Sequence, residues 1–272
     1  NVSGSGTANN GDAINVVTDT TGGTVTFNKA LDAGSITVSA GDAVVVNQNL
    51  STTAVNTSGG GAGSNAVSGG VTLTAAGSIS GAGTISTGSA TADDASTGGT
   101  STTATSGSIS LTATGANVQL GKLTTGAATV SNVNEGASTD TATAGTISLS
   151  GASLGTSTGT PQTLALGSGT GGAASVGGLL NLTATAGNIF VSSDAALRVK
   201  DLTTQAATAN TVDIRTTGGK AIVFDSTGTY ANVSGSGTAN NGDAINVVTD
   251  TTGGTVTFNK ALDAGSITVS AG

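Results

Sequence analysis

Short runs in which apolar and small polar residues alternate recur along the chain, and most of them follow a glycine. The clearest runs occupy residues 34–38, 70–73, 107–111, 145–149 and 178–182, with looser versions at 13–16 and 211–214. Alternation with a period of two predicts a β-strand that buries one face. A helical alternative is disfavoured, because glycine, serine, threonine and β-branched residues all lower helix propensity.

The two ends of the chain share one sequence. Residues 1–41 are identical to residues 232–272. Identity without a single substitution indicates a recent or continually homogenised tandem array. We therefore expect residues 1–231 to form one full repeat block of a continuous β-solenoid, and residues 232–272 to begin the next identical block. We also expect the chain to be an internal piece of a protein with many copies.

The spacing of the runs predicts how the block coils. One apolar residue can be taken from each successive run as a register mark: Ile14, Ile36, Val71, Ile109, Ile147, Leu180, Val212 and Ile245. The last mark is the copy of the first, so the seven steps between the marks cover one full block. We expect all the marks to share one face, so that seven turns make one block and the block is a whole number of turns.

Two further strand-like pieces follow the mark in most turns, as at residues 187–191 and 196–202. We therefore predict an all-β fold, a right-handed parallel β-helix (β-solenoid), with about three short strands per turn and about seven turns per block. The right hand follows from the usual chirality of parallel crossovers. An array of sandwich domains is the alternative fold.

Composition supports a narrow core and excludes several classes of protein. The chain has 45 Gly, one Tyr, four Phe and no Trp in 272 residues, so few large side chains are present to fill a wide core. It contains no Cys, which excludes disulfides. The net charge of −8 disfavours nucleic acid and anionic membranes as partners. No segment approaches the ~18 apolar residues of a membrane span, so we expect no membrane insertion.

Four low-complexity insertions precede the glycine-led strands, at residues 53–69, 88–106, 126–144 and 155–177. Insertions at equivalent positions of successive turns line up along one edge of a solenoid. They form either a flexible fringe that solvates the rod or a ridge that packs or binds a ligand.

Residues 178–189 and 107–118 share a repeated phrase, which includes Leu-Thr-Ala-Thr in both. This phrase resembles the shaft repeats of filamentous-haemagglutinin-like, two-partner-secretion giant bacterial exoproteins and adhesins. The resemblance implies a right-handed β-helix, secretion to the bacterial cell surface and a role in adhesion or biofilm matrix. It carries over no functional residues, because the shaft motif is structural.

Candidate chemistry is sparse, and we expect no enzyme and no catalytic or cofactor-binding residues. A polysaccharide-active β-helix is a remote alternative, since the chain lacks His and Trp and its basic residues are mostly single. Calcium is the one candidate cofactor, because carboxylate oxygens are suitable ligands for it. Its weak candidate ligands are Asp93, Asp94, Glu135 and Asp140, which can equally be solvated acids that aid solubility.

Two surface patterns have a simple explanation. Threonine pairs such as Thr72 and Thr74 are typical of ice-binding ladders, but they do not recur at one fixed position in every turn of the sequence. We therefore interpret them as the favoured outward residues of strands. In the one segment of mixed charge, alternation places Arg198, Lys200 and Arg215 outward, where cross-strand pairs with Asp can form.

These observations predict a structural extracellular filament or stalk of tandem solenoid blocks, for cell–cell or cell-surface attachment or biofilm matrix. The expected partner is a second copy of the protein, end to end and by lateral association into fibres. The alternative is an adhesin that binds a receptor or glycan through the insertions along one edge.

Overall fold

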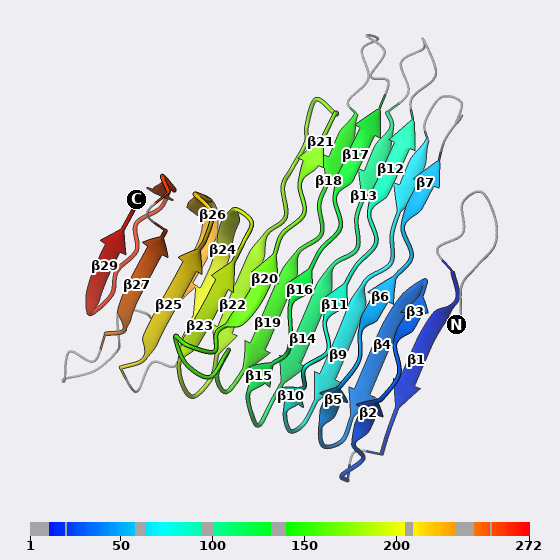
Figure 1. Ribbon diagram of the computed structural model, residues 1–272, viewed down its shortest axis with the longest axis horizontal. Coiled ribbons are helices and arrows are strands. Elements are labelled where there is room, and N and C mark those ends of the chain that lie inside the picture. Colours follow the sequence, from blue (N-terminus) through cyan, green and yellow to red (C-terminus); the bar gives the residue numbers. More distant parts are fainter. Residues whose placement is uncertain are drawn as a thin grey trace.

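The chain winds into an elongated parallel β-solenoid in the computed structural model (Figure 1). The structure describes residues 11–19, 21–57, 64–93, 101–131, 140–204, 209–231, 242–250 and 252–272. Within these ranges the secondary structure is all β, and every pair of named strands is parallel. The predicted all-β parallel β-solenoid is confirmed. The described part of the chain contains no helix that is long and apolar enough to cross a membrane.

Two nine-stranded sheets run along the rod. Main sheet 1 contains β1 (Ala13–Val17), β4 (Ser35–Ala40), β9 (Val71–Ala75), β14 (Ile109–Ala113), β19 (Ile147–Gly151), β22 (Leu180–Ala184), β24 (Leu197–Thr203), β26 (Ile222–Ala231) and β28 (Val256–Phe258). Main sheet 2 contains β3 (Leu31–Ala33), β6 (Leu50–Thr52), β11 (Ile85–Ser86), β16 (Leu123–Thr124), β20 (Gln162–Ala165), β23 (Ile189–Ser193), β25 (Thr211–Thr216), β27 (Ala244–Thr249) and β29 (Ser266–Ser270).

Three smaller sheets accompany the first part of the rod. The side sheet contains β2 (Val25–Phe27), β5 (Val44–Val46), β10 (Ile79–Ser80) and β15 (Val118–Gln119). Ridge sheet 1 contains β7 (Val55–Thr57), β12 (Ala90–Asp93), β17 (Ala128–Ser131) and β21 (Gly169–Thr170), and ridge sheet 2 contains β8 (Asn65–Val67), β13 (Thr103–Thr105) and β18 (Thr141–Thr143). A full turn passes from main sheet 1 through the side sheet to main sheet 2, and then out and back through the ridge.

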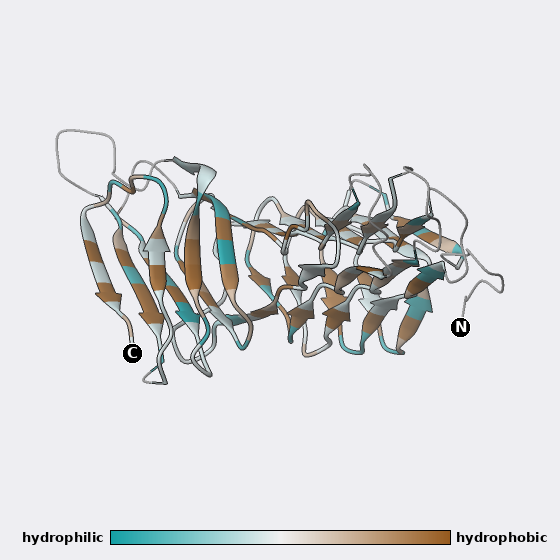
Figure 2. Cartoon of the chain, turned by 90° about the horizontal axis from the view of Figure 1, so that it is seen from above, coloured by the Kyte–Doolittle hydropathy of each residue, from teal (hydrophilic) through white to brown (hydrophobic). Residues whose placement is uncertain are grey.

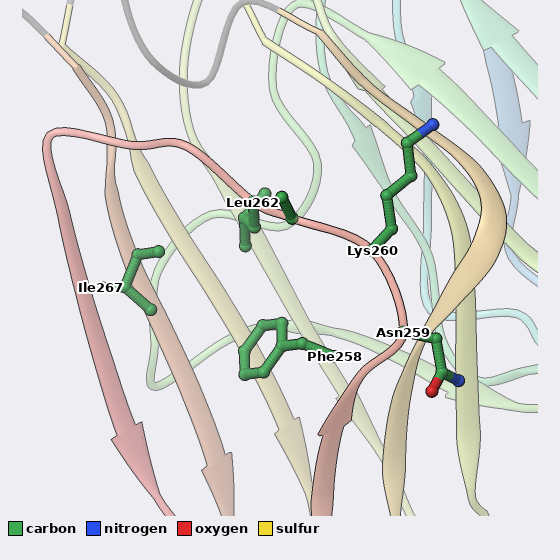
Figure 3. Close-up of a pocket in the computed structure, with 6 residues that line it drawn as sticks. Phe258, Asn259, Lys260, Leu262 and Ile267 are labelled. Carbon is green, nitrogen blue, oxygen red and sulfur yellow. The ribbon is translucent and has the colours of Figure 1, made fainter.

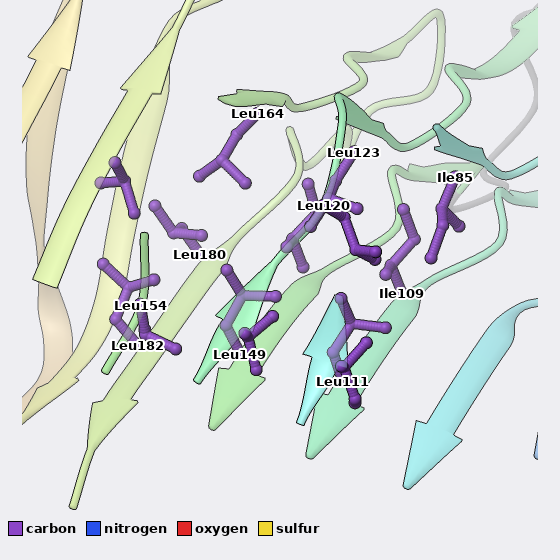
Figure 4. Packing of buried hydrophobic residues seen from close by; sticks show 14 of the residues in the cluster. Ile85, Ile109, Leu111, Leu120, Leu123, Leu149, Leu154, Leu164, Leu180 and Leu182 are labelled. Carbon is purple, nitrogen blue, oxygen red and sulfur yellow. The ribbon is translucent and has the colours of Figure 1, made fainter. Parts of the chain in front are cut away.

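Apolar side chains form continuous rows inside the rod, because each strand pairs in register with its neighbour. Leu111 pairs with Leu149, which pairs with Leu182, and Figure 4 shows these side chains in a row. All three residues are at most 2% exposed. Figure 2 shows the corresponding alternation of hydrophobic and hydrophilic residues along the strands. Since burial of a Leu or Ile stabilises by about 1.5–3 kcal/mol, these rows supply the main stabilisation of each turn.

The described parts of the first three insertions and the end of the fourth form a ridge on one edge of the rod, whereas residues 162–165 of the fourth form β20 of main sheet 2. Ridge sheets 1 and 2 enclose a second, narrower core, built only from alanine and valine. Ala104 and Ala142 are fully buried within it. Of the two interpretations of the insertions, the structure therefore shows an ordered ridge for their described parts.

Glycines allow the ridge to join the rod, at a neck where two strands and successive turns approach closely. A Cβ built on Gly107 would lie 2.1 Å from the carbonyl oxygen of Gly69, and one on Gly145 would lie 1.9 Å from that of Gly107. The Thr87 hydroxyl crosses the neck, donating to the Gly107 carbonyl at 2.6 Å and accepting from the Gly126 amide at 3.1 Å. The glycines that lead the runs at 107–111 and 145–149 are thus required by close backbone contact.

The register predicted from the sequence is correct for six marks and wrong for the last two. The residues Ile14, Ile36, Val71, Ile109, Ile147 and Leu180 pair in succession in main sheet 1. Leu180 then pairs with Val199, whereas Val212 and Ile245 pair with each other in main sheet 2. The prediction that all eight marks share one face is therefore wrong.

The cause is a change in the length of the turns. The early turns contain three strands around the rod, as predicted, but after β22 the chain alternates directly between the two main sheets. The step from Leu180 to its partner Val199 is therefore much shorter in sequence than the step from Ile147 to Leu180. Seven steps in main sheet 1 lead from β1 to β26, and β27 follows half a turn later. A block is therefore about seven and a half turns, and not a whole number.

Candidate functional site: the ridge and the block junction

Of the four predicted calcium ligands, the structure describes Asp93 and Asp140, which bind different partners. Asp94 and Glu135 lie outside the described residues. Asp93 ends β12, and its carboxylate accepts a bond from the Ser131 hydroxyl at 3.4 Å. Asp140 is buried before β18, where its carboxylate accepts the Thr102 amide at 2.9 Å. Among the described residues no three acidic side chains are grouped so that they could hold a metal ion.

Main sheet 1 carries two rows of hydroxyl groups on its outer face. Thr72 and Thr74 pair with Ser110 and Thr112, and these pair in turn with Ser148 and Ser150. The rows mix serine with threonine, and Thr74 rather than Thr72 lies opposite Thr112, so a threonine pair does not recur at one fixed position in every turn, as the sequence indicated. Their outward direction agrees with the interpretation of these residues as the polar face of half-buried strands.

A cleft of about 440 Å³ lies at the foot of the ridge, where the ridge stops and the turns become short. Its lining includes Leu166, Asp194, Arg198, Lys220 and Val223. Arg198 is partly exposed and forms an ion pair with Asp225 on the neighbouring strand, which confirms the predicted cross-strand pair. Backbone and hydroxyl hydrogen bonds from Thr227, with that ion pair, lower the pKa of Asp225.

The block junction is the place where the second copy of the repeated segment stacks on the end of the first block. β25 pairs with β27 over six residues, with Val212 opposite Ile245 and Ile214 opposite Val247. β26 pairs with β28, with Phe224 opposite Phe258. The ladder of main-chain pairing thus continues from one block into the next.

Aromatic side chains are concentrated at this junction. Phe224 is fully buried and stacks on Phe258 with ring centroids 4.7 Å apart. Tyr230 meets Phe224 edge to face at 5.8 Å, and its hydroxyl donates to the Asp225 carbonyl at 3.0 Å. Burial, with the negative charges of Asp225 and Asp201, raises the pKa of Tyr230 to about 12. The aromatic contacts add stabilisation to the apolar area that they bury.

Asp243 connects the two blocks through a buried carboxylate. It accepts the Asn210 amide at 2.8 Å, the Asn210 side-chain amide at 3.1 Å and the Thr204 hydroxyl at 2.5 Å. Asp243 is fully buried, whereas the identical residue of the first copy, Asp12, is exposed. The same aspartate therefore becomes a buried hydrogen-bond acceptor only where a preceding block covers it.

Asp250 makes a second polar connection across the junction. Its carboxylate accepts the amides of Gly218 and Gly219, both of which have a φ of +67°. It also accepts the Thr252 hydroxyl at 2.5 Å. These bonds, led by the Thr252 hydroxyl, lower the pKa of Asp250 to about 2. Glycine is favoured at both positions because other residues rarely adopt this conformation.

The last turn of the chain presents an open apolar end. A cleft of about 400 Å³ lies there, lined by Phe258, Asn259, Lys260, Leu262 and Ile267 among others (Figure 3). Ile267 and Val269 are 43% and 45% exposed, although the identical residues Ile36 and Val38 are at most 1% exposed. Val71 and Leu73 of β9 pair with Ile36 and Val38 in the first copy. The cleft therefore lies where the next turn stacks in the first block.

Sequence reasoning missed the junction residues Asp243, Asp250, Phe224 and Tyr230. The duplication itself marks the first two, since each has an identical counterpart in the first copy of the repeated segment. Nothing in the local sequence distinguishes the buried copy from the exposed one. Comparison of the chain with protein-family models, with curated proteins and with solved structures gave no match.

Replacement of Asp243 by alanine should destabilise the junction, because it removes the buried carboxylate that accepts hydrogen bonds from Asn210 and Thr204. We expect a loss of about 1–3 kcal/mol in the free energy of unfolding of the last turns, measured by hydrogen exchange. Asp12→Ala is the matched control and should change stability by less than about 0.5 kcal/mol. Equal effects of the two substitutions would contradict the assigned role.

Acid should loosen the contact between Asp250 and the Gly218–Gly219 turn. The pKa of Asp250 is about 2 in the folded chain, against about 3.9 in an unfolded chain. Because the folded value is the lower one, the stabilisation is fully present above about pH 4 and is lost as the pH falls through about 2. Exchange of the Gly218 and Gly219 amides should accelerate over this range relative to Asp250→Asn, which lacks the titrating carboxylate. A pH profile identical in the parent and the variant would refute the linkage.

Proposed function

We propose that this chain is a segment of a structural filament or stalk, secreted to the cell surface, in which identical solenoid blocks continue one another end to end. Its role is mechanical: it attaches cells to one another or to a surface, or it builds extracellular matrix. The proposal includes no catalytic activity and no required cofactor. Its main partner is a second copy of the same protein.

The observation that carries this proposal is the burial of the start of a block by the end of the preceding one. Ile14 and Val16 are only half-buried in the first copy, whereas the identical Ile245 and Val247 are fully buried beneath β25. A domain on a flexible linker would not need this surface. A block that is completed by its neighbour is suited to a continuous rod.

The composition supports an extracellular setting for such a rod. The chain is free of Cys and rich in Gly, with 8% charged residues, and its apolar residues are used in short rows. The resemblance of residues 107–118 and 178–189 to shaft repeats of secreted bacterial exoproteins points the same way. A solenoid becomes longer by adding turns, and each turn needs only a narrow core. This architecture suits a stalk.

A second candidate function is adhesion through the ridge, and a specific observation favours it. Main sheet 2 is joined to main sheet 1 by only Asp194, Ala195 and Ala196 between β23 and β24. The chain can therefore close a turn without any ridge. Because the ridge is dispensable for coiling, its ordered sheets and the cleft at its foot are suited to binding a receptor or glycan.

A protein of two complete blocks followed by a further copy of residues 1–41 should test the rod. We expect its length, measured by small-angle scattering or electron microscopy, to exceed that of the present chain by about 36 Å, the rise of seven and a half stacked turns. Ile245→Asp should introduce a hinge at the junction, while Ile14→Asp at the open start should leave the rod straight. Separate beads joined by flexible segments would rule out the continuous filament.

The adhesive role can be tested by removing the ridge. In a variant in which residues 54–67, 89–105, 127–143 and 168–176 are each replaced by Asp-Ala-Ala, which keeps β20 in main sheet 2, we expect an intact rod that no longer binds cells. Circular dichroism and electron microscopy establish the rod, and an antibody on intact cells establishes equal surface display. If the variant still binds as strongly, the ridge is not the adhesive surface. If intact cells are never labelled, even by the parent protein, the extracellular filament itself is wrong.

A further inference from the structure

The two copies of the repeated segment occupy opposite faces of the rod. β1 belongs to main sheet 1, and its copy β27 belongs to main sheet 2. β4 likewise belongs to main sheet 1, and its copy β29 to main sheet 2. The internal pairing is nevertheless unchanged, since Ile14 pairs with Ile36 and Ile245 pairs with Ile267. The segment has therefore moved as a unit around the rod axis.

The third strand of the segment moves in the same sense. β2 lies in the side sheet, where Phe27 pairs with Val46. Its copy β28 lies in main sheet 1, where Phe258 pairs with Phe224. Each strand of the second copy therefore lies about half a turn around the rod axis from its counterpart in the first copy. A local slip of one strand cannot produce this arrangement, because three strands have moved together.

We propose, on the basis of the continuous filament above, that consecutive blocks are related by a half-turn about the rod axis, so that their ridges project from opposite edges. In the first block the ridge leaves main sheet 2 and returns to main sheet 1. The second block begins with the main sheets exchanged. Its ridge must therefore leave main sheet 1 and return to main sheet 2, at the edge that carries the side sheet in the first block.

The half-turn sets the true period of the filament. Because the blocks are identical in sequence, the third block is rotated by a further half-turn about the rod axis. It therefore has the same orientation as the first block. The structural period is then two blocks, or about 15 turns and about 72 Å. Ridges follow one another every half-period on alternate edges. A filament with ridges on both edges can contact a neighbouring filament or a cell on either side.

Labelling the ridge tests the inference directly. The chain has no cysteine, so Thr170→Cys, at an exposed position of β21, provides one thiol per block. In a protein of three blocks treated with maleimide gold, we expect particles on alternate edges of the rod in electron micrographs. Successive particles should be about 36 Å apart along the axis. The unsubstituted three-block protein, treated identically, measures non-specific gold.

The outcomes separate this inference from the function on which it rests. Particles on alternate edges of a continuous rod support both. Particles on one edge of a continuous rod overturn the half-turn and leave the filament intact. Particles on beads that move independently overturn the filament and the half-turn together.

Discussion

Every turn of this protein depends on the next for the burial of its apolar side chains. A single turn exposes a row of Ile, Val and Leu, and only a stacked neighbour removes that row from water. The dependence is visible within one chain: Ile36 is covered by β9 and fully buried, whereas the identical Ile267 in the last turn is 43% exposed. Stability therefore comes from contacts between neighbouring turns, and a single turn cannot supply it alone.

This constraint explains why the junction between blocks is as well built as the interior of a block. Phe224 of the first block stacks on Phe258 of the second and meets Tyr230 edge to face. Asp243 and Asp250 accept hydrogen bonds from the turn beneath them. A weak junction would break the row of buried side chains and expose apolar surface at every block. The aromatic residues are scarce elsewhere in the chain. They lie at the junction, where a loss of packing would interrupt the rod.

The ridge also depends on neighbouring turns to bury its side chains, and its core is narrower than that of the rod. Its two sheets are close enough that only alanine and valine fit between them. At the neck the approach is closer still, so that Gly69, Gly107 and Gly145 stack with almost no space for a side chain. Small residues that would weaken an ordinary core are the ones that this geometry requires. For the described parts of the insertions, a low-complexity composition is thus compatible with an ordered structure.

The strands, the parallel solenoid and the six equivalent marks from Ile14 to Leu180 could all be predicted from the sequence, as could the edge on which the first three insertions lie. These follow from a local alternation of apolar and polar residues, which decides which face of a strand is buried. Other features are visible only in the folded chain: Val212 and Ile245 lie on the opposite main sheet, the insertion strands pair as a ridge, and Asp243 is buried while Asp12 is exposed. The physical reason is that local alternation selects a buried face but does not select the strand that covers it. That choice depends on how many residues each turn uses to close, and on which turn lies beneath.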